Sequence, residues 1–299
     1  VMLDHCPRHV QAAAAGQPRA PGQVRIFAIH EEALVEAAKL LERILSGRRA
    51  KWEQDQLRKF KEAGKTPPKG WKEKYEEPAK PDGISDDVLP QGWEWATVEQ
   101  LVSQSQYGTS VKCGHEVDGV PVLRIPNIAR GRIDLSDLKF STVPLALDEG
   151  EELVRGDMLM CRTNGSIGLI GKAAVVADAL GKPHTFASYL LRFRFVVAKA
   201  LPWWVHLFVS SQRGRGFIEG HAASSAGQHN ISLSLMHGMP IPLPPLAEQS
   251  AIVAGVIYLF LAVLGEIALL AGFALLAVES PGPTLAIATT VADLAGSPL

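Results

Sequence analysis

Polar and basic residues gather in four short, glycine-containing segments of this chain. The candidate binding residues in the first three are Tyr107, Thr109, Ser110, Lys112, Arg124, Asn127, Arg130, Arg162, Thr163, Asn164, Ser166 and Lys172, and residues 224–230 add Gln228 and Asn230. Lys and Arg neutralise phosphates, whereas Ser, Asn, Gln and Arg can read the donor and acceptor patterns of base edges. The combination therefore predicts loops that contact nucleic acid.

Each of these features also has a purely structural interpretation, and the sequence leaves both open. Arg192 and Arg194 add positive charge, but they alternate with apolar residues, which by itself indicates one solvated face of a strand. Asn164 precedes a glycine and could serve only to form a tight turn. Tyr107 and Tyr189 are of a kind that more often packs in or beside a core than stacks on bases. The joint occurrence of the segments favours nucleic acid.

Complete catalytic signatures are missing from the sequence. Gly171 and Lys172 resemble the end of a phosphate-binding loop, but Ser166 replaces its first glycine and Ala173 replaces the hydroxyl that would bind Mg²⁺. The histidines form no recognisable triad with a nucleophile elbow. We therefore expect a chain with no catalytic residue that itself binds no metal or cofactor.

The composition indicates a folded protein. With 47% hydrophobic residues and a formal net charge of −1, the chain of 299 residues is too apolar and too weakly charged to be disordered. Its three cysteines, Cys6, Cys113 and Cys161, are too far apart to suggest a disulfide framework or a zinc site, which favours a reducing cytoplasm. Every basic residue lies at or before Arg215, so the basic side chains belong to the part of the chain that carries the polar segments.

The elements that must position these residues fall into two parts. Residues 31–63 predict a spacer helix, because Leu34, Leu41 and Ile44 belong to an apolar set that recurs in steps of three and four. Residues 64–90 are rich in proline and charge and indicate a linker wrapped on or near a surface.

Residues 91–246 predict an α+β domain. Short β-branched segments are interrupted there by Gly and Pro about every eight to twelve residues, a spacing typical of short strands. The expected strands are Val120–Ile125, Asp157–Cys161, Leu169–Val176, Tyr189–Val197 and Met239–Leu243. The expected helices are Val98–Gln104 and Pro202–Phe217, the second with Trp203, Leu207 and Phe208 facing inward.

Both ends of the sequence are atypical. Residues 1–30 form an unassigned leader, and a start at Val1 suggests a fragment. Residues 247–299 begin as a distal helix and then become apolar, with Glu266 the single charge in 251–278. As a helix that stretch would measure about 42 Å, enough to cross a bilayer. It could be a membrane anchor, a hydrophobic packing helix or an out-of-frame tail, and the loss of every basic residue favours the last.

Several strings, in consistent order, resemble the specificity subunit of type I restriction-modification systems. They are Leu89–Trp95, Tyr107–Ser110, Pro121–Ile128, Gly156–Asp157 with Arg162–Ser166, Phe186–Tyr189, Ser225–Gln228 and Ile241–Gln249. Upstream, Leu40–Ile44 and Arg48–Trp52 resemble the end of the central region between that family's two recognition domains.

The resemblance implies that residues 91–246 are a target recognition domain that reads one half of a split DNA site from the major groove. It implies that the spacer helix sets the distance to the other half and docks modification subunits. S-adenosylmethionine, ATP and Mg²⁺ would belong to partner chains, the modification and restriction subunits. The chain itself would be a non-catalytic, cytoplasmic DNA reader.

The sequence departs from the family pattern in two respects. A full specificity subunit has two recognition domains, so this chain is expected to be a fragment or a half-subunit whose partner is a second copy or the other half. From Gly255 onward, apolar residues replace the family's charged distal helix. The alternative function is a membrane-attached interaction module anchored by residues 251–278.

Overall fold

The computed structural model describes residues 36–82, 88–147, 150–197, 201–256, 258–259 and 262–263. Helices and sheets are mixed in an α+β arrangement, as the sequence predicts. The leader, residues 1–30, lies outside the described residues, as does the chain after residue 263.

The centre of the domain is a four-stranded antiparallel sheet in the order β2-β10-β6-β8. Its strands are β2 (Val102–Tyr107), β10 (Leu190–Phe195), β6 (Met158–Cys161) and β8 (Ala173–Val175). All four residues of β6 are buried, because both faces of this strand are covered. Helix α4 (Leu201–Ser210) packs against β8, and α5 (Gln212–His221) packs against α4.

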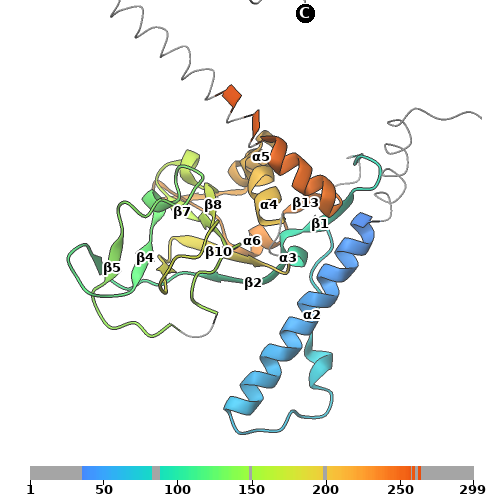
Figure 1. The fold of residues 1–299 in the computed structure, drawn as a ribbon, viewed down its shortest axis with the longest axis horizontal. Coiled ribbons are helices and arrows are strands. Elements are labelled where there is room, and N and C mark those ends of the chain that lie inside the picture. The colour runs from blue at the N-terminus through green and yellow to red at the C-terminus, as the bar shows by residue number, and fades with distance from the viewer. Residues whose placement is uncertain are drawn as a thin grey trace, which may run out of the picture.

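Three smaller sheets surround the central one. A second four-stranded sheet has the order β3-β5-β4-β9, with β4 and β9 parallel, and lies at the end of the domain away from α2 (Figure 1). A three-stranded sheet has the order β11-β12-β7, and β1 pairs with β13. Their bounds are β3 (Cys113–Gly114), β5 (Lys139–Ser141), β4 (Pro121–Leu123), β9 (Thr185–Phe186), β11 (Ala223–Ser225), β12 (Gln228–Asn230), β7 (Thr163–Asn164), β1 (Glu94–Thr97) and β13 (Pro240–Leu243).

Helix α2 (Glu36–Glu62) projects away from the sheets (Figure 1). Its first half is held by the domain, where Leu40 and Ile44 are 3% and 0% exposed. Its second half packs on the segment that returns along it. Trp52 stacks on Trp71 with ring centroids 5.9 Å apart and meets the edge of Tyr75 at 5.3 Å. The proline-rich residues 64–82 therefore lie along α2.

The expected helices differ from those observed. The helix expected over 98–104 is shorter, because α3 (Val98–Leu101) gives way directly to β2. The helix expected over 202–217 is interrupted at Ser211, which starts α5 by accepting a hydrogen bond from the amide of Gly214. Of the residues predicted to face inward in the first half, Trp203 and Phe208 are partly buried and pack against the core. The fully buried residues are Leu201, Pro202, Trp204, Val205 and Val209, which the prediction missed.

A further helix begins at residue 246 and is described to residue 256. The indole nitrogen of Trp93 donates to Glu248 at 3.0 Å, and the side-chain nitrogen of buried Gln249 donates to the carbonyl of Pro244 at 2.7 Å. Among the described residues, no helix has the length and apolar character that a bilayer crossing requires. Most of the proposed anchor, residues 251–278, lies outside the described part of the chain.

Candidate nucleic-acid interface

Loops that are far apart in the sequence come together at one edge of the central sheet, the edge formed by the ends of its strands. Strands β2 and β6 end at this edge, and β10 and β8 begin there, because every neighbouring pair is antiparallel. Tyr107 is the last residue of β2, Arg162 directly follows β6, and Lys172 directly precedes β8. Tyr189 precedes β10 at the same edge. The antiparallel order therefore places three predicted binding residues, Tyr107, Arg162 and Lys172, at the same edge as Tyr189.

Arg162 and Tyr107 form the centre of this edge. The guanidinium carbon lies 4.6 Å from the centre of the tyrosine ring, close enough for a cation–π interaction. Arg162 also donates to Asn230 Oδ1 at 3.2 Å and to the Ser188 carbonyl at 3.5 Å. The Tyr107 hydroxyl accepts a hydrogen bond from the Leu233 amide at 3.1 Å. These contacts join three of the four polar segments that the sequence predicts, those of Tyr107, Arg162 and Asn230, to Ser188 and Leu233.

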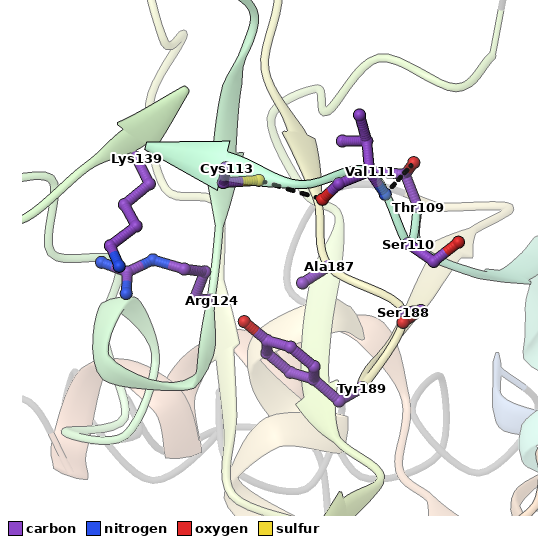
Figure 2. A pocket seen from close by; sticks show the side chains of 9 residues that line it. All are labelled: Thr109, Ser110, Val111, Cys113, Arg124, Lys139, Ala187, Ser188 and Tyr189. Atoms are coloured by element: carbon purple, nitrogen blue, oxygen red, sulfur yellow. Dashed lines mark hydrogen bonds between the residues drawn. The ribbon is translucent and has the colours of Figure 1, made fainter. Parts of the chain in front are cut away.

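A polar pocket of about 290 Å³ opens beside this centre. It is lined by Thr109, Ser110, Val111, Cys113, Arg124, Lys139, Ala187, Ser188 and Tyr189. Figure 2 shows Arg124 and Lys139 on one side, Thr109 and Ser110 on the other, and the Tyr189 ring between them. Two cations and several hydroxyls form a lining that suits an anionic or polar group.

Gly108 allows two walls of the pocket to approach each other. A Cβ atom at this position would lie 2.2 Å from the Phe186 carbonyl oxygen. The neighbouring Thr109 amide donates to that same oxygen at 2.8 Å, and the Ser188 amide donates to the Thr109 carbonyl at 2.8 Å. The predicted residue Thr109 therefore fixes the backbone of the pocket wall.

Asn127 does not face solvent, contrary to its assignment as a base-reading residue. It is 1% exposed, and its side-chain nitrogen donates to the carbonyls of Asp134 and Asp137 at 2.8 and 3.0 Å. Its oxygen accepts from the Arg124 amide at 2.8 Å. The amide is thus fully used in shaping the loop, and Asn127 acts as a positioning residue for Arg124.

Arg124 has a carboxylate partner within the same loop. Its guanidinium donates to the carboxylate and the carbonyl of Asp137, both at 2.9 Å. His115 lies 3.5 Å from the other carboxylate oxygen of Asp137. Arg124 is therefore oriented at the pocket wall rather than projecting freely.

The remaining predicted cations and turn residues are accessible. Lys112, Arg130 and Lys172 are exposed, with the Arg130 side chain 76% accessible and 3.9 Å from Asp134. Asn164 does not adopt the positive φ expected of a hairpin turn; it lies in β7, and its side chain accepts from the Ser166 amide at 2.9 Å. Ser110 and Ser166 are exposed, whereas the Thr163 hydroxyl donates to the His229 carbonyl at 3.2 Å.

Arg192 and Arg194, which the sequence predicts to add positive charge, and also Arg215, have structural partners within the domain. Arg192 is 0% exposed and donates to the Gly150 carbonyl at 2.6 Å, and burial lowers its pKa to about 10. Arg194 pairs with both carboxylate oxygens of Asp157 at 2.8 Å. Arg215 donates to the Ile170 carbonyl and to Glu219. The solvated face predicted from the alternation of Arg192 and Arg194 is wrong, because Arg192 is buried and the Arg194 side chain is only 21% exposed.

The two described cysteines do not suggest thiolate chemistry. Burial raises the pKa of the Cys161 thiol to about 11 and raises that of Cys113 as well. Within the described residues, no group of His, Cys, Asp and Glu side chains could hold a metal ion. The edge is therefore a surface of hydrogen-bonding groups and cations.

Sequence reasoning missed part of this surface. Lys139, Ser188 and Tyr189 line the pocket but were not among the predicted binding residues. The string Phe186–Tyr189 was a usable signal for the last two. Nothing in the sequence marked Lys139, which reaches the pocket only because β5 pairs with β3 and β4.

No family model matches the sequence. The chain is 28% identical over 162 residues to the type I restriction enzyme EcoKI specificity subunit of Escherichia coli strain K12, covering 54% of this chain and 35% of that protein. It is 27% identical over 173 residues to the StySPI specificity subunit of Salmonella potsdam, covering 56% of this chain and 36% of that protein. The chain thus spans little more than a third of the length of these relatives.

A comparison with solved structures also finds similar chains, two of which follow. A structure concerned with complex assembly and conformational transition of the type I R-M system has a TM-score of 0.45 and 18% identity, covering 82% of this chain and 54% of that chain. The HsdS subunit from Thermoanaerobacter tengcongensis has a TM-score of 0.41 and 18% identity, covering 81% of this chain and 51% of that chain.

Proposed function

We propose that this chain, which is similar to type I restriction enzyme specificity subunits over about half of its length, recognises a specific DNA sequence. The observation that carries the proposal is the convergence of polar and basic loops at one sheet edge, centred on Arg162 and Tyr107. Exposed lysines and Arg130 would contact phosphates, and neutral polar side chains would contact base edges. The recognised unit is one half of a bipartite site.

Docking of modification subunits is assigned to the helical part of the chain. Helix α2 extends from the domain and is stiffened by the aromatic contacts of Trp52, Trp71 and Tyr75. The Arg48 guanidinium on α2 also donates a hydrogen bond to the Tyr75 hydroxyl at 2.9 Å. A rigid arm of this kind suits a spacer that separates two readers. A second copy of the chain or the other half of a longer subunit would read the second half-site.

The chemistry of modification and cleavage is assigned to partner chains. Methyl transfer from S-adenosylmethionine would occur on modification subunits, and cleavage dependent on ATP and Mg²⁺ would require a restriction subunit. In this division of labour the present chain supplies sequence recognition and contributes no catalytic residue.

The proposal is tested by selection from randomised DNA. The full chain, bound to a type I modification subunit, is incubated with a randomised duplex library, and the retained duplexes are sequenced. We expect a short enriched motif and binding that weakens steeply with salt, because phosphate contacts release counterions. Retention of duplexes without any enriched motif would contradict sequence recognition.

A further inference from the structure

The hairpin formed by β11 and β12, residues 223–230, is the exposed outer hairpin of the three-stranded sheet β11-β12-β7. Ser225 pairs with Gln228, and the two residues between them, Ala226 and Gly227, have φ angles of 48° and 76°. Left-handed conformations at both central positions define the tight turn whose twist matches that of an antiparallel ribbon. All residues from 223 to 228 are exposed.

Ala226 occupies a conformation that favours glycine, asparagine or aspartate. It is the single non-glycine residue with positive φ in the described part of the chain. Non-glycine residues in this region carry strain and occur preferentially at functional sites. The tip is therefore held in a defined shape at a local cost in stability.

Three polar side chains of the hairpin are not used to stabilise the fold. Ser224, Ser225 and Gln228 make no side-chain hydrogen bond to any other described residue, whereas Asn230 accepts one from Arg162 at 3.2 Å. Three neighbouring side chains thus present donors and acceptors to the outside, and the fourth ties the ribbon to the centre of the interface.

The hairpin also lies beside the other predicted recognition loop. β12 pairs with β7, which places His229 opposite Asn164. At the tip, a Cβ atom on Gly165 would lie 3.6 Å from the Gly227 carbonyl oxygen. The turn that follows β7 and the tip of the hairpin therefore form one continuous polar surface.

The charge of the hairpin distinguishes it from the loops around it. Residues 223–230 include no Lys, Arg, Asp or Glu, whereas Lys112, Arg130 and Lys172 are exposed elsewhere on the domain. Neutral amides and hydroxyls suit base edges more than phosphates, and the major groove admits a two-stranded ribbon. The separation of neutral and cationic groups matches a division between base reading and phosphate contact.

We propose that the hairpin 223–230 enters the major groove and that Gln228 reads an adenine there. The glutamine amide would donate to adenine N7 and accept from the N6 amino group, which is the bidentate pairing of Gln with this base. This inference rests on the proposed DNA recognition and adds to it the reading element and the base.

The test compares the motifs selected by three forms of the full chain bound to a type I modification subunit. These are the wild type, Gln228→Arg and Gln228→Ala. Arg prefers guanine N7 and O6, so Gln228→Arg should change one adenine of the motif to guanine. Gln228→Ala should relax that single position and weaken binding to the wild-type motif by about tenfold.

A matched control separates altered reading from added charge. Gln91 is exposed in the turn before β1, outside α2 and the polar loops, so Gln91→Arg adds the same charge away from the hairpin and should leave the motif unchanged. Thermal unfolding of every variant checks that the fold is retained. If the wild type selects a motif and both Gln228 variants select the same one, the hairpin assignment is overturned. If the wild type selects no motif, the proposed function fails first.

Discussion

The guanidinium of Arg162 lies over the ring of Tyr107, with its carbon 4.6 Å from the ring centre. The two residues end two strands, β2 and β6, that do not pair with each other but flank β10. The Tyr107 hydroxyl also accepts a hydrogen bond from the Leu233 amide, so the same side chain orders a third segment near the hairpin. In the proposed function, Tyr107 would act on DNA binding through the position of Arg162.

Two substitutions at Tyr107 should separate the contribution of its ring to DNA binding from that of its hydroxyl. Tyr107→Leu removes the aromatic face, and the loss of about 0.5–1 kcal/mol of cation–π energy should weaken binding to the selected duplex by about twofold to fivefold. Tyr107→Phe keeps the face and should bind within about twofold of wild type. Fluorescence anisotropy at one fixed salt concentration measures both, and equal binding by the Leu variant would contradict the positioning role.

Asn127 should affect stability rather than base preference. Asn127→Ala leaves the Arg124 amide and two carbonyls without their buried partner, which should lower the free energy of unfolding by about 3 kcal/mol. Urea unfolding of the full chain measures this loss, with exposed Gln54→Ala as the control expected to stay within about 0.5 kcal/mol. A stable Asn127→Ala protein with a changed motif would restore the residue to the base-reading set.

Gly108 should tolerate no side chain. In Gly108→Ala the new methyl group would meet the Phe186 and Ala187 carbonyls at 2.2 and 2.4 Å, so the strands must separate. We expect a loss of about 1–3 kcal/mol in urea unfolding, the usual range for overpacking. The control is Gly216→Ala on α5, where a Cβ meets nothing within 4 Å and helix propensity should stabilise the protein by up to about 1 kcal/mol. Equal effects at the two positions would rule out the close approach.

Buried histidines should make the fold weaker in mild acid. Burial lowers the pKa of His206, although its hydrogen bond to the Ala173 carbonyl at 3.0 Å opposes this, and burial also lowers the pKa of His237. The unfolded chain then binds more protons than the folded one, so stability is fully present above the unfolded pKa of about 6.5 and declines as pH falls through it.

Unfolding in urea at about pH 7.5 and pH 5.5 measures this linkage. The wild type should lose more stability between the two values than His206→Gln, which cannot take up the proton. An equal loss of stability in both proteins would contradict a contribution of His206 to this pH dependence.

The apolar strands were predictable, and the polar ones were not. β6 and β13 coincide with runs that the sequence marked as strands, because burial selects apolar residues. β10 was also predicted, from a run in which apolar residues alternate with Arg192 and Arg194. β2 escaped notice because Val102–Tyr107 is mostly polar and is held by its pairing with β10. The hairpin was predicted only as a polar loop, for the same reason.

The roles of the arginines depend on partners distant in the sequence. Arg192 and Arg194 follow the alternation of a half-solvated strand, yet the loop around Gly150 and Glu152 covers them and accepts their hydrogen bonds. Asp157, a fully buried carboxylate, completes the pairing with Arg194. No local pattern distinguishes such a buried arginine from one that binds phosphate, so these positions require the tertiary structure.

In the proposed function, this chain distinguishes one DNA sequence from others. The most direct measurement is the ratio of dissociation constants for the selected duplex and for a scrambled duplex of equal length and composition. The full chain bound to a modification subunit is used for both, at the same salt concentration. We predict a ratio of at least about a thousandfold in favour of the selected duplex. A ratio near one would contradict sequence recognition by this chain.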